Sequence, residues 1–174
     1  DGGEVYWTPM MIFPGEVYSR GGLLTMKRVD GRWSPPAWTS FSGPKGEDDV
    51  PFFSPDGKRM YFISRRPVPD DTRGRSERIW FTDRTAEGWS EPNPLDANVN
   101  SMDMHWAFSL DREKNVYFAG RSPDGLGMAD IYVARFKDRK YEKPVNLGEP
   151  LNSAANEDSP FVARDGSYLL FSRQ

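Results

Sequence analysis

Apolar residues and turn formers alternate in a recognisable stretch near the middle of the chain. Residues 50–64 contain an aromatic run, then Pro55-Asp56-Gly57, then a second apolar run. Aromatic and β-branched residues favour strands, whereas Pro, Asp and Gly favour the positions of a tight turn. The stretch therefore predicts a β-hairpin.

The same pattern recurs twice, at 105–118 and at 159–171. Its aspartates, Asp56, Asp111 and Asp165, are 55 and 54 residues apart. The third copy keeps an Asp-Gly pair. The second copy lacks the glycine, so we expect a longer turn there.

A second pair of strands is predicted after each hairpin. Its markers recur at matching spacings: Trp33, Trp89 and Tyr141, with Leu24, Trp80 or Tyr132 nine residues before each. Prolines within three residues of each marker predict an outer, edge-like strand, since proline cannot donate to a central ladder. Leu95 with Asn100-Ser101 and Leu147 with Asn152-Ser153 then share one internal spacing.

These units predict an all-β fold, a β-propeller of four-stranded antiparallel blades. We expect one propeller segment over 1–174, with a partial blade at 1–46, blades at 47–101 and 102–155, and a partial blade at 156–174. About three blades' worth of strands is fewer than the four to eight of closed propellers. We therefore expect part of a larger ring, the alternative being a homodimer that completes it.

Composition excludes several classes of function. The net charge is −3 and the basic residues are scattered, which argues against a nucleic-acid surface. No apolar run approaches the roughly 20 residues of a membrane-spanning helix, so no membrane insertion is expected. The chain has no cysteine, which removes disulfides and thiol catalysis but leaves the redox compartment open, and its start carries no secretory signal.

Acidic residues recur where the first strand of each unit begins. Aligning the copies gives Asp48, Asp103 and Glu157 one position, and Asp49, Met104 and Asp158 the next, with His105 following. Carboxylates and imidazole could bind a cationic ligand or a divalent cation such as calcium. The alternative is that the carboxylates cap turns, because a turn cap is needed in every unit and a catalytic residue only once. A third hypothesis is that Asp103 and His105 lie on the same face of one strand and act as a general acid–base pair.

Two loops add weaker candidates. Residues 124–127 with Asp130 could form a calcium loop or a plain glycine-bearing turn, since the acidic spacing of an EF-hand is absent. The arginines at 65–66 and at 73–75 could contact an anionic sugar or a protein, or could simply be solvated. Most tryptophans are expected to pack between blades rather than stack on sugars.

Three stretches together resemble the TolB-type, WD-repeat-like β-propeller repeat: 54–62, 130–133 and 143–152. The resemblance covers most of the chain from about residue 47 and, more faintly, 3–43. It implies the propeller fold and a bacterial, usually exported protein, hence a periplasmic or extracellular location. It implies little about activity, because the family mixes binding modules with peptidase-linked propellers and some lyases.

Two functions remain as hypotheses. The first is a non-enzymatic scaffold that binds a protein or a glycan through loops at the channel mouth. The second is a carbohydrate-active lyase or hydrolase that acts there with Asp103 and His105, with or without a bound cation. No required cofactor is expected in the first case.

Overall fold

The computed structural model describes residues 2–11, 19–44, 46–68, 71–72, 76–102 and 104–174. The described chain is all-β, with several antiparallel sheets, none of them closed, and one short 3₁₀ helix, η1 (Val99–Ser101). No helix among these residues is long and apolar enough to cross a membrane.

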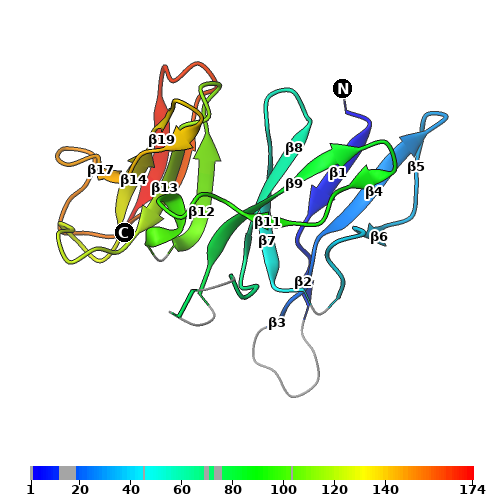
Figure 1. Ribbon diagram of the computed structural model, residues 1–174, viewed down its shortest axis with the longest axis horizontal. Coiled ribbons are helices and arrows are strands. Elements are labelled where there is room, and N and C mark those ends of the chain that lie inside the picture. The colour runs from blue at the N-terminus through cyan, green and yellow to red at the C-terminus, as the bar shows by residue number, and fades with distance from the viewer. Residues whose placement is uncertain (1, 12–18, 45, 69–70, 73–75, 103) are drawn as a thin grey trace.

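The two central sheets share one strand order (Figure 1). The first consists of β7 (Asp48–Phe53), β8 (Arg59–Ser64), β9 (Arg78–Thr85) and β11 (Asn93–Pro94), with β10 (Gly88–Trp89) extending it beside β9. The second consists of β12 (Met104–Leu110), β13 (Val116–Gly120), β14 (Asp130–Ala134) and β17 (Val145–Asn146). A separate hairpin, β15 (Phe136–Lys137) with β16 (Lys140–Tyr141), follows β14.

Two further sheets flank this pair. One, which we call the first sheet because it is the first in the chain, contains β1 (Glu4–Trp7), β4 (Leu24–Val29), β5 (Arg32–Trp33) and β6 (Ala37–Trp38). The last is the hairpin of β18 (Glu157–Val162) and β19 (Leu169–Arg173). A two-stranded ribbon, β2 (Met10–Met11) with β3 (Ser19–Arg20), leaves the first sheet.

Left-handed residues close the three predicted hairpins at corresponding places. Gly57 and Gly166 have φ of 68° and 72°, and Lys114 takes φ of 67° in the second hairpin. The expectation of a longer second turn is wrong. Five residues lie between the last paired residues of that hairpin, Leu110 and Val116, whereas six lie between Phe53 and Met60 and between Val162 and Leu169. A lysine can adopt the left-handed angle at a cost, so the missing glycine did not require a longer loop.

Asp111 does not match the other two turn aspartates. Its backbone accepts the Lys114 amide, as the Ser54 and Ala163 carbonyls accept the glycine amides. Asp111 therefore holds the position of Ser54 and Ala163. The predicted match of Asp111 with Asp56 and Asp165 is wrong by two positions, although the three aspartates are evenly spaced.

Two buried asparagines fix the segments that follow the outer strands. Asn100 accepts the Ile79 amide at 2.9 Å and donates to the Ile79 carbonyl at 3.0 Å. Asn152 makes the same two bonds with Ile131, at 2.8 and 2.9 Å. The recurring Asn-Ser spacing thus marks a structural role. The asparagine oxygen pairs with a strand amide that would otherwise be buried unpaired, and the asparagine nitrogen adds a second bond to a carbonyl that already accepts the Leu95 or Leu147 amide.

The core lies between sheets, because the side chains of β8 alternate between two neighbours. Met60 and Phe62 pack with Leu23, the residue just before β4 of the first sheet, whereas Tyr61 and Ile63 pack with the sheet of β12–β17. Successive strand residues point to opposite faces, so one strand supplies both cores.

The sheets have two distinct ends (Figure 1). At the turn end lie the hairpin turns 54–58, 111–115 and 163–168. At the other, which we call the loop end, β7, β12 and β18 begin, and the loops 65–77 and 121–129 join the second strand of each central sheet to the third. The predicted acidic positions Asp48, Asp49, Glu157 and Asp158 belong to the loop end.

Candidate functional site

Asp48 is fully buried at the start of β7 and is neutralised within the protein. Its Oδ2 accepts hydrogen bonds from the Ser42 hydroxyl and from Arg66 Nη2, the latter at 2.7 Å. Arg66 also donates to the Phe41 carbonyl at 2.6 Å, and its guanidinium lies 5.3 Å from the centre of the Phe62 ring. The arginine therefore acts as an internal counter-ion as well as a loop residue.

Glu157 repeats this arrangement at the start of β18. It is fully buried, and its Oε1 accepts from the Ser153 hydroxyl at 2.6 Å and from Arg173 Nε at 2.8 Å. Burial by itself raises the pKa of Glu157, but the bonds from Ser153 and Arg173 outweigh it, so the pKa lies below its ordinary value. The carboxylate is held ionised by its partners.

Asp49 and Asp158 support a bulge in the strand that carries them. The next residues, Val50 and Ser159, have φ of 52° and 54°, in the left-handed region. Each aspartate accepts the amide hydrogen of that following residue, at 2.8 Å for Val50 and 2.5 Å for Ser159. The side chains thus stabilise a backbone conformation that β-branched residues avoid.

The third copy of the acidic position is only partly described. Asp103 and the side chain of His105 lie outside the described residues, although the backbone of His105 belongs to β12. Pairing places Met104 opposite Gly120, where the other copies place Asp48 opposite Ser64 and Glu157 opposite Arg173. By this register Met104 occupies the position of Asp48 and Glu157, because β12 has seven residues where β7 and β18 have six.

No group of three or more His, Asp or Glu side chains gathers among the described residues in a way that could hold a metal ion. The loop proposed for calcium is organised by Asp130 instead. Its Oδ2 accepts the Leu126 amide at 2.7 Å and the Asn146 side-chain amide at 2.9 Å. These contacts describe a carboxylate that ties its own loop to β17.

Several buried polar atoms near the loop end have no hydrogen-bond partner within the described ranges. They are Asp48 Oδ1, Arg66 Nη1, Trp80 Nε1, Asp130 Oδ1 and the Tyr132 hydroxyl. Trp80 and Tyr132 occupy corresponding positions, since they pair with Pro94 and Asn146 on the outer strands. Buried polar atoms of this kind are usually satisfied by ordered water or by a bound group.

Arg78 was not singled out from the sequence, yet it is the largest fully buried side chain of the described structure. It donates to the Ser76 hydroxyl and the Glu77 carbonyl, and its Nη2 lies 3.4 Å from Asp71 Oδ2. It begins β9, so it anchors the end of the loop 65–77 to the sheet. Its only signal in the sequence was its place just before an apolar run.

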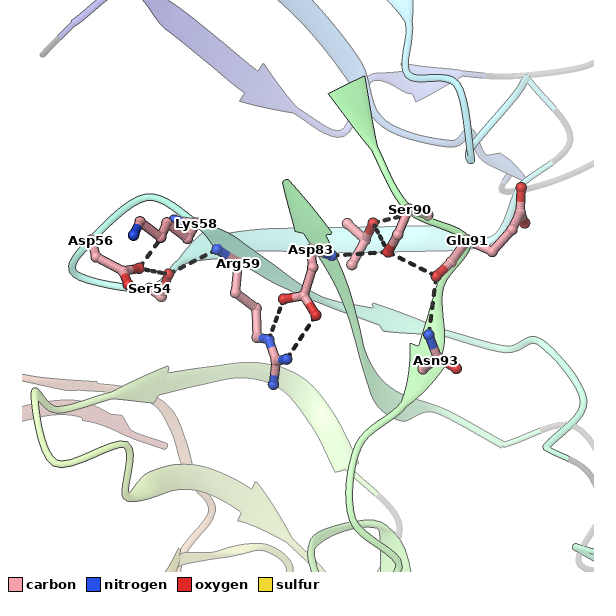
Figure 2. Close-up of polar contacts among 9 residues, drawn as sticks. Ser54, Asp56, Lys58, Arg59, Asp83, Ser90, Glu91 and Asn93 are labelled. Carbon is pink, nitrogen blue, oxygen red and sulfur yellow. Dashed lines mark hydrogen bonds and ion pairs between the residues drawn. The ribbon is translucent and has the colours of Figure 1, made fainter. Parts of the chain in front are cut away.

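A polar cluster at the turn end involves the side chains of the first predicted hairpin. Figure 2 shows Arg59 of β8 reaching Asp83 of β9 through two hydrogen bonds, of 2.6 and 2.8 Å. The Arg59 guanidinium also lies 3.8 Å from the centre of the Phe81 ring. Asp56 accepts the Ser54 hydroxyl and the Lys58 amide in the turn itself. The bonds of this cluster lie within its own sheet and turn, so the cluster fastens the turn to β9.

The exposed side chains of the loop end differ in character from its buried carboxylates. Leu126 and Met128 are both exposed on the loop between β13 and β14. That loop is held in place, because the Met128 amide donates to the Ala155 carbonyl at 3.1 Å and Ala129 forms a bridge with Asn156. The loop end therefore presents apolar groups on an anchored backbone.

Comparisons with protein-family models, with curated proteins and with solved structures find no match for this chain.

Proposed function

We propose that the four sheets are blades of a β-propeller and that the protein is a non-enzymatic binding module. The blade arrangement is supported by the shared strand order of the two central sheets and by the stacking in which β8 contributes to a core on each side. The resemblance to the TolB type agrees with this arrangement and gives the proposed periplasmic or extracellular location.

One observation carries the choice of a binding function over an enzymatic one. Asp48 and Glu157 are each buried, paired with an arginine and hydrogen-bonded by a serine. A general acid or base must reach the proton that it transfers, and these two carboxylates are already engaged. The lyase or hydrolase alternative therefore has to rest on Asp103 and His105 alone.

The ligand site proposed is the loop end, and a protein is favoured over a glycan as the ligand. Leu126 and Met128 supply exposed apolar contacts, and methionine side chains adapt readily to different apolar surfaces. A glycan site would instead call for exposed aromatic platforms, and the aromatic Trp80 and Tyr132 at this end are buried.

The proposal is tested by panning a phage-displayed random peptide library on the immobilised protein. Peptides that bind the loop end should lose about tenfold or more in affinity, roughly 1.4 kcal/mol, for Leu126→Asp/Met128→Asp. Val145→Asp is the matched control, because Val145 is an exposed apolar residue on the outer strand β17. Enriched peptides that bind both variants equally well would refute a loop-end site.

The enzymatic alternative is tested separately with a panel of soluble polysaccharides. We expect neither new reducing ends nor unsaturated sugar products, with or without added calcium. Product formation that is lost in His105→Gln would replace the binding function by the carbohydrate-active one.

A further inference from the structure

The hairpin β18–β19 exposes an apolar face. Phe161 and Leu170 are cross-strand partners and are 50% and 59% exposed. Cross-strand partners share one face, so both side chains point away from the neighbouring sheet. On the opposite face Val162 is buried, and its amide donates to the Ser109 hydroxyl of β12.

The corresponding positions in the first central sheet are covered by the neighbouring sheet. Phe52 and Tyr61 are partners in β7 and β8 as Phe161 and Leu170 are in β18 and β19. Tyr61 belongs to the core shared with the next sheet, and the ring centre of Phe52 lies 6.0 Å from that of Phe108 in β12. The outer face of β18–β19 is thus the face on which, elsewhere in this protein, another sheet packs.

The first sheet exposes the complementary face. Tyr6 points into the core shared with the sheet of β7–β11, so Val5 and Trp7 point the other way. Their partners Met26 and Leu24 share that outer face, and Val5 is 45% exposed.

These four side chains correspond to the residues that cover Phe52 and Tyr61. Trp7 pairs with Leu24 as Phe118 pairs with Tyr132, and Val5 pairs with Met26 as Val116 pairs with Ala134. All four residues of the β13–β14 set are buried in the core that contains Tyr61, with Phe52 packed against it.

We propose that a second copy of this chain docks head to tail, with the face of Phe161 and Leu170 against the face of Val5, Trp7, Leu24 and Met26. The two faces lie on sheets in opposite halves of the molecule (Figure 1), so within the described residues neither face packs against the other. The contact repeats the packing already present between the two central sheets. It is heterologous, so copies assemble into a closed ring or a chain. This inference rests on the correspondence of the sheets and not on the ligand site at the loop end.

The test is sedimentation velocity over a range of concentrations. The wild-type chain should sediment as a dimer or a larger assembly, and Leu170→Glu and Val5→Glu should each be monomeric, because either change places a charge in an apolar contact. Each variant keeps the face that the other has lost. An equimolar mixture of the two should therefore form a one-to-one dimer through a single contact.

An exposed apolar residue outside both faces provides the control. Val145→Glu should assemble like the wild type, and circular dichroism should show that all variants are folded. A wild-type chain that stays monomeric at the highest concentration overturns the proposal. So does a case in which only one of the two variants dissociates, because that identifies a contact between two identical faces.

Discussion

Arg173 Nε donates to Glu157 Oε1 at 2.8 Å, and the carboxylate that it neutralises is fully buried. Replacing the arginine by methionine leaves a buried carboxylate without its counter-ion. Breaking a buried pair in this way costs about 3–5 kcal/mol, and we expect about 2 kcal/mol here because the arginine is partly exposed. Urea unfolding of Arg173→Met measures the loss.

An exposed pair provides the matched control for that change. Arg112 lies 3.4 Å from Glu113, and both side chains are largely exposed. Arg112→Met should cost less than about 0.5 kcal/mol, since exposed pairs contribute little. Equal losses for the two variants would mean that the buried pair has no special role.

The lowered pKa of Glu157 should make the free energy of unfolding depend on pH. The pKa of Glu157 is lowered in the folded protein, so the unfolded chain binds more protons as the pH falls below about 4.3. The stabilisation is fully present above that pH and is lost as the pH falls through the folded pKa. The difference in unfolding free energy between the wild type and Glu157→Gln should therefore shrink on acidification. A difference that is constant or grows toward low pH would contradict this assignment.

Asn152 should be among the most sensitive polar positions. Asn152→Ala removes the side-chain acceptor of the Ile131 amide, which lies in a fully buried strand, whereas the Ile131 carbonyl keeps its bond from the Leu147 amide. An unsatisfied buried group costs about 1–3 kcal/mol, so we expect a loss of about 2 kcal/mol in urea unfolding. Asn93→Ala removes an amide that bonds only to the Glu91 carbonyl at an exposed site, and it should change stability by less than about 0.5 kcal/mol.

Replacing the left-handed glycine of the first hairpin turn should cause a smaller loss of stability. Gly57 has φ of 68° and open space where the methyl group of an alanine would lie, so Gly57→Ala introduces backbone strain without a clash. The expected cost is about 1 kcal/mol. Gly43→Ala also meets open space but has no left-handed angle, and thermal unfolding should find it neutral or slightly stabilising.

The strand pattern was the part of the fold that the sequence made predictable. Aromatic runs, turn residues and the prolines of the outer strand each act locally, so the four strands around Asp56 and Trp89 lie where expected. The register in β12 was not predictable. This strand has one residue more than β7 or β18 and the turn after it is one residue shorter, so the spacing between the copies in the sequence stays almost even. Only the pairing of Met104 with Gly120 reveals them.

The sequence predicted where the acidic residues of the candidate site lie, but not which groups bind them. The acidic pattern located Asp48 and Glu157 at strand starts, but neither the ligand-binding nor the turn-cap interpretation named the serine and arginine side chains that bond them. Their partners could not be identified beforehand. Ser42 and Arg66 lie 6 and 18 residues from Asp48, and nothing local in the sequence joins them.

The alternation of side chains along β8 restricts how this chain can change in evolution. Deleting one residue within β8 would exchange the inward sets of Met60 with Phe62 and Tyr61 with Ile63, and so spoil both neighbouring cores at once. Length variation should therefore be confined to loops such as 65–77 and 121–129. Lineages related to this chain should differ most in the surface that they offer at the loop end while keeping the strand lengths fixed.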